Sequence, residues 1–310
     1  MQTNSTGVLY QKIGVTIEKL ALDLLSKNSG DRIPPIAQYQ EEFGVSRGTI
    51  QNAIRYLEDA KAMSLTHHGH QGTYIASLDY ARLQEHCMRQ GLMGIMPLPY
   101  SVTYEGFATA LYEQLRDLRF NMAYARGAVG RIKLVVSGAY QFAISSQYAA
   151  EYAIACGEEI EVVLNFGPGS FLSQHVLLLR DKNREGIADG MRVAYDRDSL
   201  DQSRITQNLV KGKQVELVNI RTQQTIGALL GGTIDAGVWN YDDILENHHL
   251  DNLKVVFLDA SDYNKLFSTA VLLVRKDGGY LKKVLKKHIC VQETLEILDD
   301  VRCGRRSPSY

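Results

Sequence analysis

The 310-residue sequence predicts an α/β protein made of a small N-terminal head and a larger domain in which strands and helices alternate. Two observations predict this fold class. Residues 33–76 contain a glycine turn between two short amphipathic stretches and then a glycine-bounded hairpin. From about residue 93 onward, short apolar runs alternate with stretches of helical periodicity, which is typical of sheets covered by helices.

The first three predicted elements are helices. One from about Val8 to Lys27 has an apolar face formed by Leu9, Ile13, Ile17, Leu20 and Leu24. A second, from about Pro35 to Phe43, should end at Gly44, because the left-handed conformation at a helix end favours glycine. Ser46 is a good N-cap for a third helix, whose buried face is predicted to contain Ile50, Ala53, Ile54 and Leu57.

The opposite face of the third helix carries residue types that read DNA bases: Arg47, Thr49, Gln51, Asn52 and Arg55. Arginine pairs with guanine, and asparagine or glutamine pairs with adenine. Two short strands, 64–66 and 72–75, should form a wing whose tip holds His68, His70 and Gln71. This arrangement is typical of a winged helix-turn-helix, which places one helix in the major groove, so double-stranded DNA is the predicted partner.

The head resembles the winged helix-turn-helix of the GntR superfamily through Ile33-Pro34, the segment 41–49 (EEFGVSRGT), Leu57-Glu58 and the segment 72–75 (GTYI). This chain departs from the pattern that the resemblance implies. It has Ala37 and Gln51 where the family has arginines, and histidines where the family has a basic wing tip. Residues 1–76 hold seven Lys or Arg and seven Asp or Glu. A formally neutral head should bind DNA weakly unless the protein is a homodimer.

Composition and spacing exclude several classes. The three wing histidines, His67, His68 and His70, have no cysteine or carboxylate beside them, so no metal is assigned. The four cysteines are far apart and have no CxxC spacing, which favours reduced thiols and a cytoplasmic location. Neither a signal peptide nor an apolar run of about 20 residues is found, so no membrane association is expected. No cofactor is predicted.

Residues 77–92 are interpreted as a linker and 93–310 as an effector-binding domain with mostly parallel sheets. The predicted strands are 92–96, 121–124, 141–146, 161–165, 174–179, 191–195, 214–220, 234–239, 253–258 and 269–274. The predicted helices are 104–117, 129–137, 147–156, 203–210, 225–231 and 280–302.

The larger domain resembles the type II periplasmic-binding-protein fold, because a strand ending in Ser145-Ser146 and the segment 232–240 (GTIDAGVWN) occupy matching places in two successive α/β units. The resemblance implies two lobes: 93–172 with 260–310, and 173–259. A GntR-like head joined to such a domain resembles the YhfZ family of proposed transcriptional regulators over nearly the whole chain. It implies a regulator but brings no ligand with it.

Ligands in open α/β lobes bind beyond the carboxyl ends of strands and against helix N-termini. The residues at those places define the predicted effector site: Ser101, Tyr104, Ser145, Ser146, Gln147, Ser170, Thr222, Thr225, Trp239 and Asn240. Hydroxyls and amides of this kind suit a small polar or anionic molecule, although serine and threonine at such places are also common helix caps.

The sequence therefore predicts a ligand-responsive, DNA-binding transcriptional regulator that is not an enzyme. The alternative is a cytosolic small-molecule binding protein whose head serves dimerisation or protein contacts, which the neutral charge of the head favours. A decarboxylating or thiamine-pathway-type enzyme on the same two-lobed fold is a third interpretation. It has the least support, because the sequence contains no nucleophile elbow, Walker loop or dinucleotide fingerprint.

Overall fold

The computed structural model describes residues 5–88, 90–246, 252–258 and 265–310. The chain divides into two compact units, which are described separately. The first comprises Met1–Met93, Glu113–Asn121 and Asp277–Cys290, and the second comprises Gly94–Tyr112, Met122–Lys276 and Val291–Tyr310. In the part of the chain that the structure describes, no helix combines the length and apolarity needed to cross a membrane.

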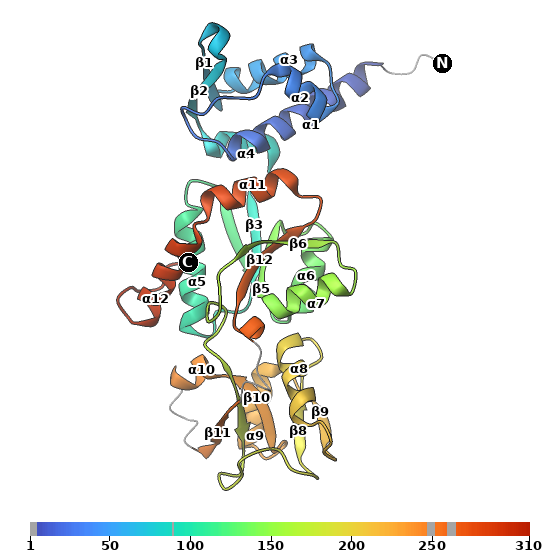
Figure 1. Ribbon diagram of the computed structural model, residues 1–310, viewed down its shortest axis with the longest axis vertical. Coiled ribbons are helices and arrows are strands. Elements are labelled where there is room, and N and C mark those ends of the chain that lie inside the picture. Colours follow the sequence, from blue (N-terminus) through green and yellow to red (C-terminus); the bar gives the residue numbers. More distant parts are fainter. Residues whose placement is uncertain (1–4, 89, 247–251, 259–264) are drawn as a thin grey trace. The chain divides into compact units, whose positions relative to one another are not determined.

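The head has the predicted order of elements: α1 (Ser5–Leu25), α2 (Ile36–Phe43), α3 (Arg47–Asp59), β1 (Met63–His67) and β2 (Thr73–Leu78) (Figure 1). Gly44 ends α2 in the left-handed conformation, with φ 65°, where a side chain would be strained. The two strands pair antiparallel. The core between the helices includes the fully buried Leu24, Tyr39 and Ile50, so the apolar periodicity correctly predicts which faces turn inward.

Residues 77–92, predicted as a linker, contain regular structure. Helix α4 (Tyr80–Cys87) begins at Asp79, whose side chain accepts a hydrogen bond from the backbone N–H of Arg82. Helix α4 packs on α1 through residues that include the fully buried Leu83. Only one narrow side of this helix is buried, which agrees with its polar composition.

Helix α11 (Gly279–His288) also belongs to the first unit and packs on α1. The ammonium group of Lys287 donates to the carbonyl oxygen of Lys27, and a ring nitrogen of His288 lies 3.0 Å from the carbonyl oxygen of Leu25. These two carbonyls stand at the C-terminal end of α1, where no intrahelical donor is available. The phenol of Tyr280 donates to Glu42 of α2 over 2.5 Å.

The larger domain contains two five-stranded sheets (Figure 1). The first sheet has the order β4-β3-β5-β12-β6. Its strands are β3 (Leu92–Met96), β4 (Phe120–Tyr124), β5 (Phe142–Ser146), β6 (Ile160–Asn165) and β12 (Ala270–Arg275). Helices α5 (Val102–Gln114), α6 (Ala128–Val136), α7 (Gln147–Ala155) and α12 (Val291–Arg302) belong to the same lobe. Its core includes Ile132, Val135 and Val271.

The second sheet has the order β11-β7-β10-β8-β9. Its strands are β7 (His175–Leu179), β8 (Arg192–Tyr195), β9 (Glu216–Asn219), β10 (Ala236–Asn240) and β11 (Lys254–Phe257). Helices α8 (Leu200–Leu209), α9 (Thr225–Leu230) and α10 (Tyr241–Glu246) complete this lobe. The chain passes from the first lobe to the second between β6 and β7, and returns between β11 and β12. The structure thus has the predicted two-lobed architecture; the predicted return point at 259–260 lies outside the described residues.

Three predictions about this domain were wrong. The sheets are mixed, because the strand that follows each crossing, β7 or β12, runs antiparallel to both of its neighbours. The predicted helix 280–302 is two helices, because Ile289 takes an extended conformation and ends α11. Helix α10 was not predicted, since its sequence begins with two aspartates and has little apolar periodicity.

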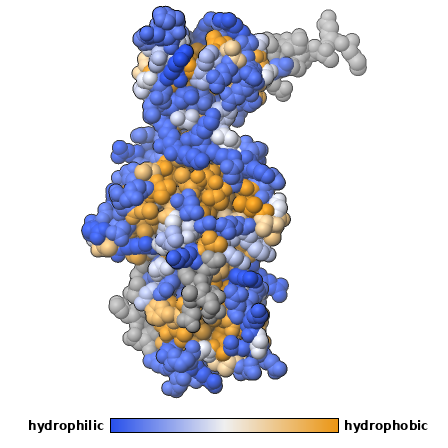
Figure 2. Space-filling view, viewed as in Figure 1, coloured by the Kyte–Doolittle hydropathy of each residue, from blue (hydrophilic) through white to orange (hydrophobic). Residues whose placement is uncertain are grey.

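Figure 2 shows a mainly hydrophilic visible face on the head and broader apolar areas over the two lobes. Two exposed apolar side chains, Tyr152 and Ile154, lie on α7 of the first lobe. On α3 of the head, the large exposed hydrophobic residue is Tyr56. The polar face of the head therefore reflects the outward residues of its helices and wing.

Candidate functional site

Helix α3 of the head is fixed by its N-cap. The Ser46 hydroxyl accepts a hydrogen bond from the backbone N–H of Thr49 over 3.3 Å and lies 2.9 Å from the Thr49 hydroxyl. Ile50, Ala53 and Leu57 are completely buried. The helix is therefore held in one rotational setting about its axis by a cap at its start and by an apolar face along its length.

That setting turns the predicted DNA-binding residues outward. Arg47, Gln51, Asn52 and Arg55 are exposed, whereas Thr49 is half-buried and its hydroxyl is engaged with the cap. Four of the five side chains are thus free to reach a partner. Thr49 is placed to stabilise the start of the helix.

The wing carries its predicted residues at the tip. His68 precedes a short 3₁₀ turn, Gly69–Gln71, that contains His70 and Gln71, and all three residues are exposed. The His68 ring packs edge-on against Tyr74, with ring centroids 5.3 Å apart. Among the residues that the structure describes, no group of three His, Cys, Asp or Glu side chains could hold a metal ion.

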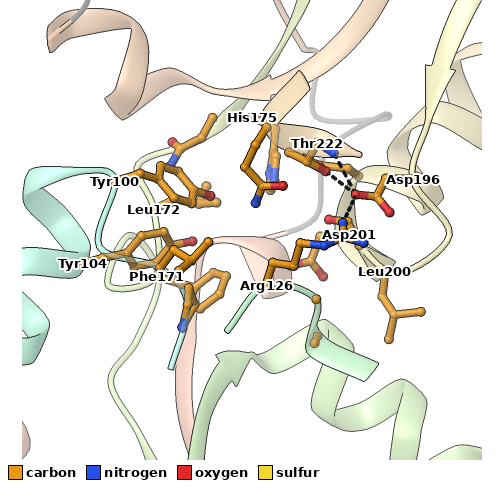
Figure 3. A pocket seen from close by; sticks show the side chains of 18 of the residues that line it. Tyr100, Tyr104, Arg126, Phe171, Leu172, His175, Asp196, Leu200, Asp201 and Thr222 are labelled. Carbon is orange, nitrogen blue, oxygen red and sulfur yellow. Dashed lines mark hydrogen bonds and ion pairs between the residues drawn. The ribbon is translucent and has the colours of Figure 1, made fainter. Parts of the chain in front are cut away.

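A cleft lies in the second unit where the two lobes meet (Figure 3). Its volume is about 70 Å³, room for a few water molecules or a small ligand. It is lined by Pro97, Leu98, Tyr100, Tyr104, Arg126, Gly127, Ala128, Arg131, Phe171, Leu172, His175, Asp196, Ser199, Leu200, Asp201, Gln202, Thr222, Gln223 and Asn240.

Three of the predicted effector residues line this cleft: Tyr104, Thr222 and Asn240. Thr222 donates through its backbone N–H and its hydroxyl to the Asp196 carboxylate, over 2.8 and 2.9 Å. Asn240 is 2% exposed, and within the described chain its amide nitrogen has no hydrogen-bond partner. A buried amide donor without an acceptor is costly, so Asn240 is suited to meet a ligand oxygen.

The other predicted effector residues of the first lobe lie outside the cleft lining. Ser101 and Ser145 are buried, and their hydroxyls have no partner within the described residues. Ser146 caps α7 and donates to Asp201 over 2.8 Å. Gln147 contacts the side chains of Glu151 and Asn165.

The remaining predicted residues are structural in their contacts. The Ser170 hydroxyl closes the turn at Gly167 and accepts from the backbone N–H of Ala270. Thr225 is buried against Gly237, where an added Cβ would lie 2.5 Å from the threonine methyl. The indole N–H of Trp239 donates to Asp243 over 2.7 Å, and the ring belongs to the apolar core of the second lobe.

The strongest charges in the cleft were missing from the predicted site. Arg126 follows β4 of the first lobe and forms ion pairs with two aspartates of the second: with Asp196 over 3.2 Å (Figure 3), and with Asp198 over 3.1 Å. A signal was present in the sequence. The segment Ala125-Arg126-Gly127 stands at the carboxyl end of a predicted strand, the place where ligands are expected.

Arg131 of α6 is a buried cation. It is 3% exposed, and its guanidinium donates to the carbonyl oxygens of Ile144 and Ala125 over 3.3 and 2.8 Å. Burial lowers the pKa of Arg131 to about 10, so the group is positively charged at neutral pH. Two backbone carbonyls neutralise less of this charge than a carboxylate would.

Asp201, at the start of α8, is the acidic counterpart of Arg131. Burial raises the pKa of Asp201 to about 7, against the lowering effects of the Ser146 hydrogen bond and of the Arg131 charge. His175 lies in the lining as well, and burial lowers its pKa to about 3, which keeps the imidazole neutral. At neutral pH the cleft can thus change its charge through Asp201.

An aromatic wall faces these charged groups (Figure 3). The Tyr104 ring lies between Tyr100 and Phe171, with centroid distances of 5.3 and 5.4 Å. Burial raises the pKa of Tyr100 to about 12 and that of Tyr104 well above 10, so both phenols remain hydrogen-bond donors. The cleft offers two arginines and two aspartates on one side and aromatic rings on the other, which suits a small polar ligand.

Comparison with known proteins also separates an N-terminal helix-turn-helix region from a larger C-terminal domain. The family model of the YhfZ C-terminal domain matches residues 79–310, and that of a helix-turn-helix domain matches residues 28–75. The uncharacterized protein YhfZ of Escherichia coli (strain K12) is 28% identical over 302 residues, covering 97% of this chain and 98% of that protein.

Two solved structures extend the comparison. YhfZ from Shigella flexneri aligns with a TM-score of 0.60 and 28% identity, over 71% of this chain and 93% of that one. The periplasmic aliphatic sulphonate binding protein SsuA from Escherichia coli aligns with a TM-score of 0.51 and 13% identity, over 69% of this chain and 70% of that one. The second likeness shows the periplasmic-binding-protein fold alone.

Proposed function

The chain belongs to the family of the YhfZ C-terminal domain, and from this premise we propose that it is a ligand-responsive, DNA-binding transcriptional regulator. The GntR-like head, residues 1–76, binds an operator. The domain 93–310 binds a small polar or anionic effector in its cleft, and residues 77–92 join the two. The protein acts in the cytoplasm as a homodimer, without catalysis.

One observation carries the proposal: a domain of helix-turn-helix type presents the polar face of its recognition helix to solvent. Arg47, Gln51 and Asn52 project from the first turns of α3, the part of such a helix that contacts base edges. The residue types match the hydrogen-bonding groups that guanine and adenine display in the major groove.

Bonds across the cleft support regulation by a ligand. Besides the Arg126–Asp196 ion pair, the Ser146 hydroxyl donates to Asp201, and the Thr103 hydroxyl donates to Asp242 over 2.9 Å. Each joins an element of one lobe to an element of the other. A ligand that competes for or completes these bonds changes the balance between open and closed forms, and a coupling of about 1–3 kcal/mol is enough for regulation.

A dimer follows from the size of the head. One recognition helix covers too few base pairs for useful specificity, so two heads on half-sites about one helical turn apart are needed. Residues 1–76 are also formally neutral. One head therefore gains little affinity from non-specific attraction to phosphates, and this is a second reason to expect two heads on the DNA.

The test is selection of bound fragments from sheared DNA of the source organism by the full-length protein, run beside Arg47→Ala. We expect enrichment of a two-fold symmetric site by the wild type and its loss in the variant, because Arg47 is exposed at the start of α3. Arg116→Ala, which removes an exposed arginine outside the head, should retain the enrichment. Equal enrichment by Arg47→Ala would refute the role given to that residue.

The neutral head favours a second candidate function. In that case the protein is a small-molecule binding protein whose head serves dimerisation or protein contacts. It predicts no enriched DNA from a folded sample, together with a thermal shift on addition of a metabolite. Sedimentation analysis of a variant with a destabilised head core, such as Leu57→Ala, would then show whether the head holds the dimer together.

A further inference from the structure

A groove opens in the head between helix α3 and the wing. It is lined by Arg32, Ile33, Pro34, Pro35, Ile36, Gln51, Ile54, Arg55, Glu58, Leu65, His67, Gly72 and Thr73. The lining combines apolar residues such as Ile33 and Leu65 with polar and charged ones. Gln51 and Arg55 enter it from α3, whereas Arg32 enters from the segment that precedes α2.

Arg32 is held in place by the backbone around it. Residues 30–33 run beside β2: the N–H of Gly30 donates to Ile75 over 2.7 Å, and the N–H of Ile33 donates to Thr73 over 3.0 Å. Arg32 itself forms an antiparallel bridge with Tyr74. The segment therefore acts as a short third strand of the wing, and its arginine does not lie on a free loop.

The Arg32 side chain packs against Gly72. A Cβ added to Gly72 would lie 2.5 Å from Nε of Arg32 and 3.0 Å from Cζ, so a larger residue there would displace the guanidinium from its present position. Gly72 also has a φ of +105°, a conformation that L side chains rarely adopt. Gly72 of the wing thus allows a backbone turn and leaves space beside it for the Arg32 side chain.

The arginines around this groove have no acidic partners. Within the described chain, Arg32, Arg47 and Arg55 form no ion pair, whereas Arg82 of the same unit is 3.2 Å from Asp79. All three are exposed. Of the groove residues, Glu58 carries the negative charge, so the lining is net positive even though the head as a whole is neutral.

We propose that Arg32 binds the phosphate backbone of duplex DNA, with the groove between α3 and the wing receiving a phosphate. The inference rests on the proposed DNA-binding function. An exposed guanidinium with no carboxylate partner presents several N–H donors in one plane, which suits a phosphate. Arg32 pairs with Tyr74 beside the tip of the wing and lines the same groove as Gln51. A phosphate contact supplies affinity and orientation, and base choice remains with α3.

The test measures the affinity of the full-length protein for a fluorescently labelled duplex of random sequence, over sodium chloride concentrations from about 50 to about 200 mM. Arg32→Ala should weaken binding to every duplex alike and reduce the slope of log affinity against log salt by about one. Arg32→Lys retains the charge and should keep the wild-type slope. Arg116→Ala changes the net charge equally but lies outside the head, so its slope should equal that of the wild type.

The two proposals fail in different ways. Duplex binding by the wild type with an unchanged slope in Arg32→Ala would overturn the role of Arg32 and leave the DNA-binding function intact. A wild type that binds no duplex even at low salt would overturn both. Circular dichroism of Arg32→Ala and Arg32→Gln, the second of which keeps more of the packing on Gly72, separates loss of charge from loss of fold.

Discussion

In the head, several residues proposed to bind a partner lie on the exposed face of one short stretch of chain, 47–55, a few residues from the cap that fixes it, and the others lie on or beside the wing. In the cleft, they are buried and come from segments as far apart as Tyr104, Arg126, Asp201 and Asn240. The first surface is determined by local sequence, and the second by the way two lobes meet. Head and cleft should therefore respond differently to substitution and to pH.

The largest expected effect concerns the cleft. Burial gives Asp201 a pKa of about 7 in the folded protein, compared with 3.8 for the free side chain. Between these values the unfolded chain releases the proton and the folded chain keeps it, so stability falls as the pH rises. Asp201→Asn removes this loss, and its stability relative to wild type should increase by roughly 4 kcal/mol between about pH 4 and about pH 7.

Urea unfolding at several pH values measures this difference. The comparison with wild type is needed because His175, whose pKa burial lowers to about 3, changes stability in the opposite direction over part of the same range. His175 is common to both proteins and cancels in the difference. A difference that stays constant between pH 4 and pH 7 would contradict the buried, protonated state of Asp201.

The next effect concerns the core of the head. Leu57 is completely buried in α3, so Leu57→Ala should cost about 3 kcal/mol through lost burial and a residual cavity. Hydrogen exchange should show faster exchange in α1–α3, with little change in the second lobe. Asn52→Ala, on the exposed face of the same helix, serves as the control. If Leu57→Ala accelerated hydrogen exchange equally in the head and in both lobes, the two units would unfold together.

The smallest effect concerns the cap of the recognition helix. Ser46→Ala removes the acceptor for the Thr49 N–H and should destabilise the head by about 1 kcal/mol. Ser46→Asp retains an acceptor and should restore most of this stability. Thermal unfolding of the three proteins measures the effect, and an alanine variant as stable as wild type would mean that the cap contributes little.

The same contrast explains what the sequence can predict. The glycine and serine at 44 and 46 identify the head because a turn and a cap depend on neighbouring residues. Tyr104, Thr222 and Asn240 were found because strand ends face the cleft. Arg131 was missed because it lies within α6, at a helix position that periodicity assigns to the core. Its role depends on Asp201 and Tyr104, which are brought close only by folding.

The antiparallel strands β7 and β12 show a second limit. Alternating strands and helices predict parallel neighbours. However, β7 and β12 each follow a crossing from the other lobe, and each runs antiparallel to its neighbours. The sequences of β7 and β12 do not indicate their direction, because both are short apolar runs of the kind found in any buried strand. Direction is therefore a property of the chain path.

Helix α11 has a consequence for how such proteins can diversify. It lies between β12 and α12 in the sequence, yet Lys287 and His288 serve as donors to the end of α1. A gene fusion that exchanges residues 1–76 for a different head would leave those donors facing a surface they do not match. Heads and C-terminal domains in this family should therefore be inherited together, and working chimaeras should require α11 to be exchanged along with the head.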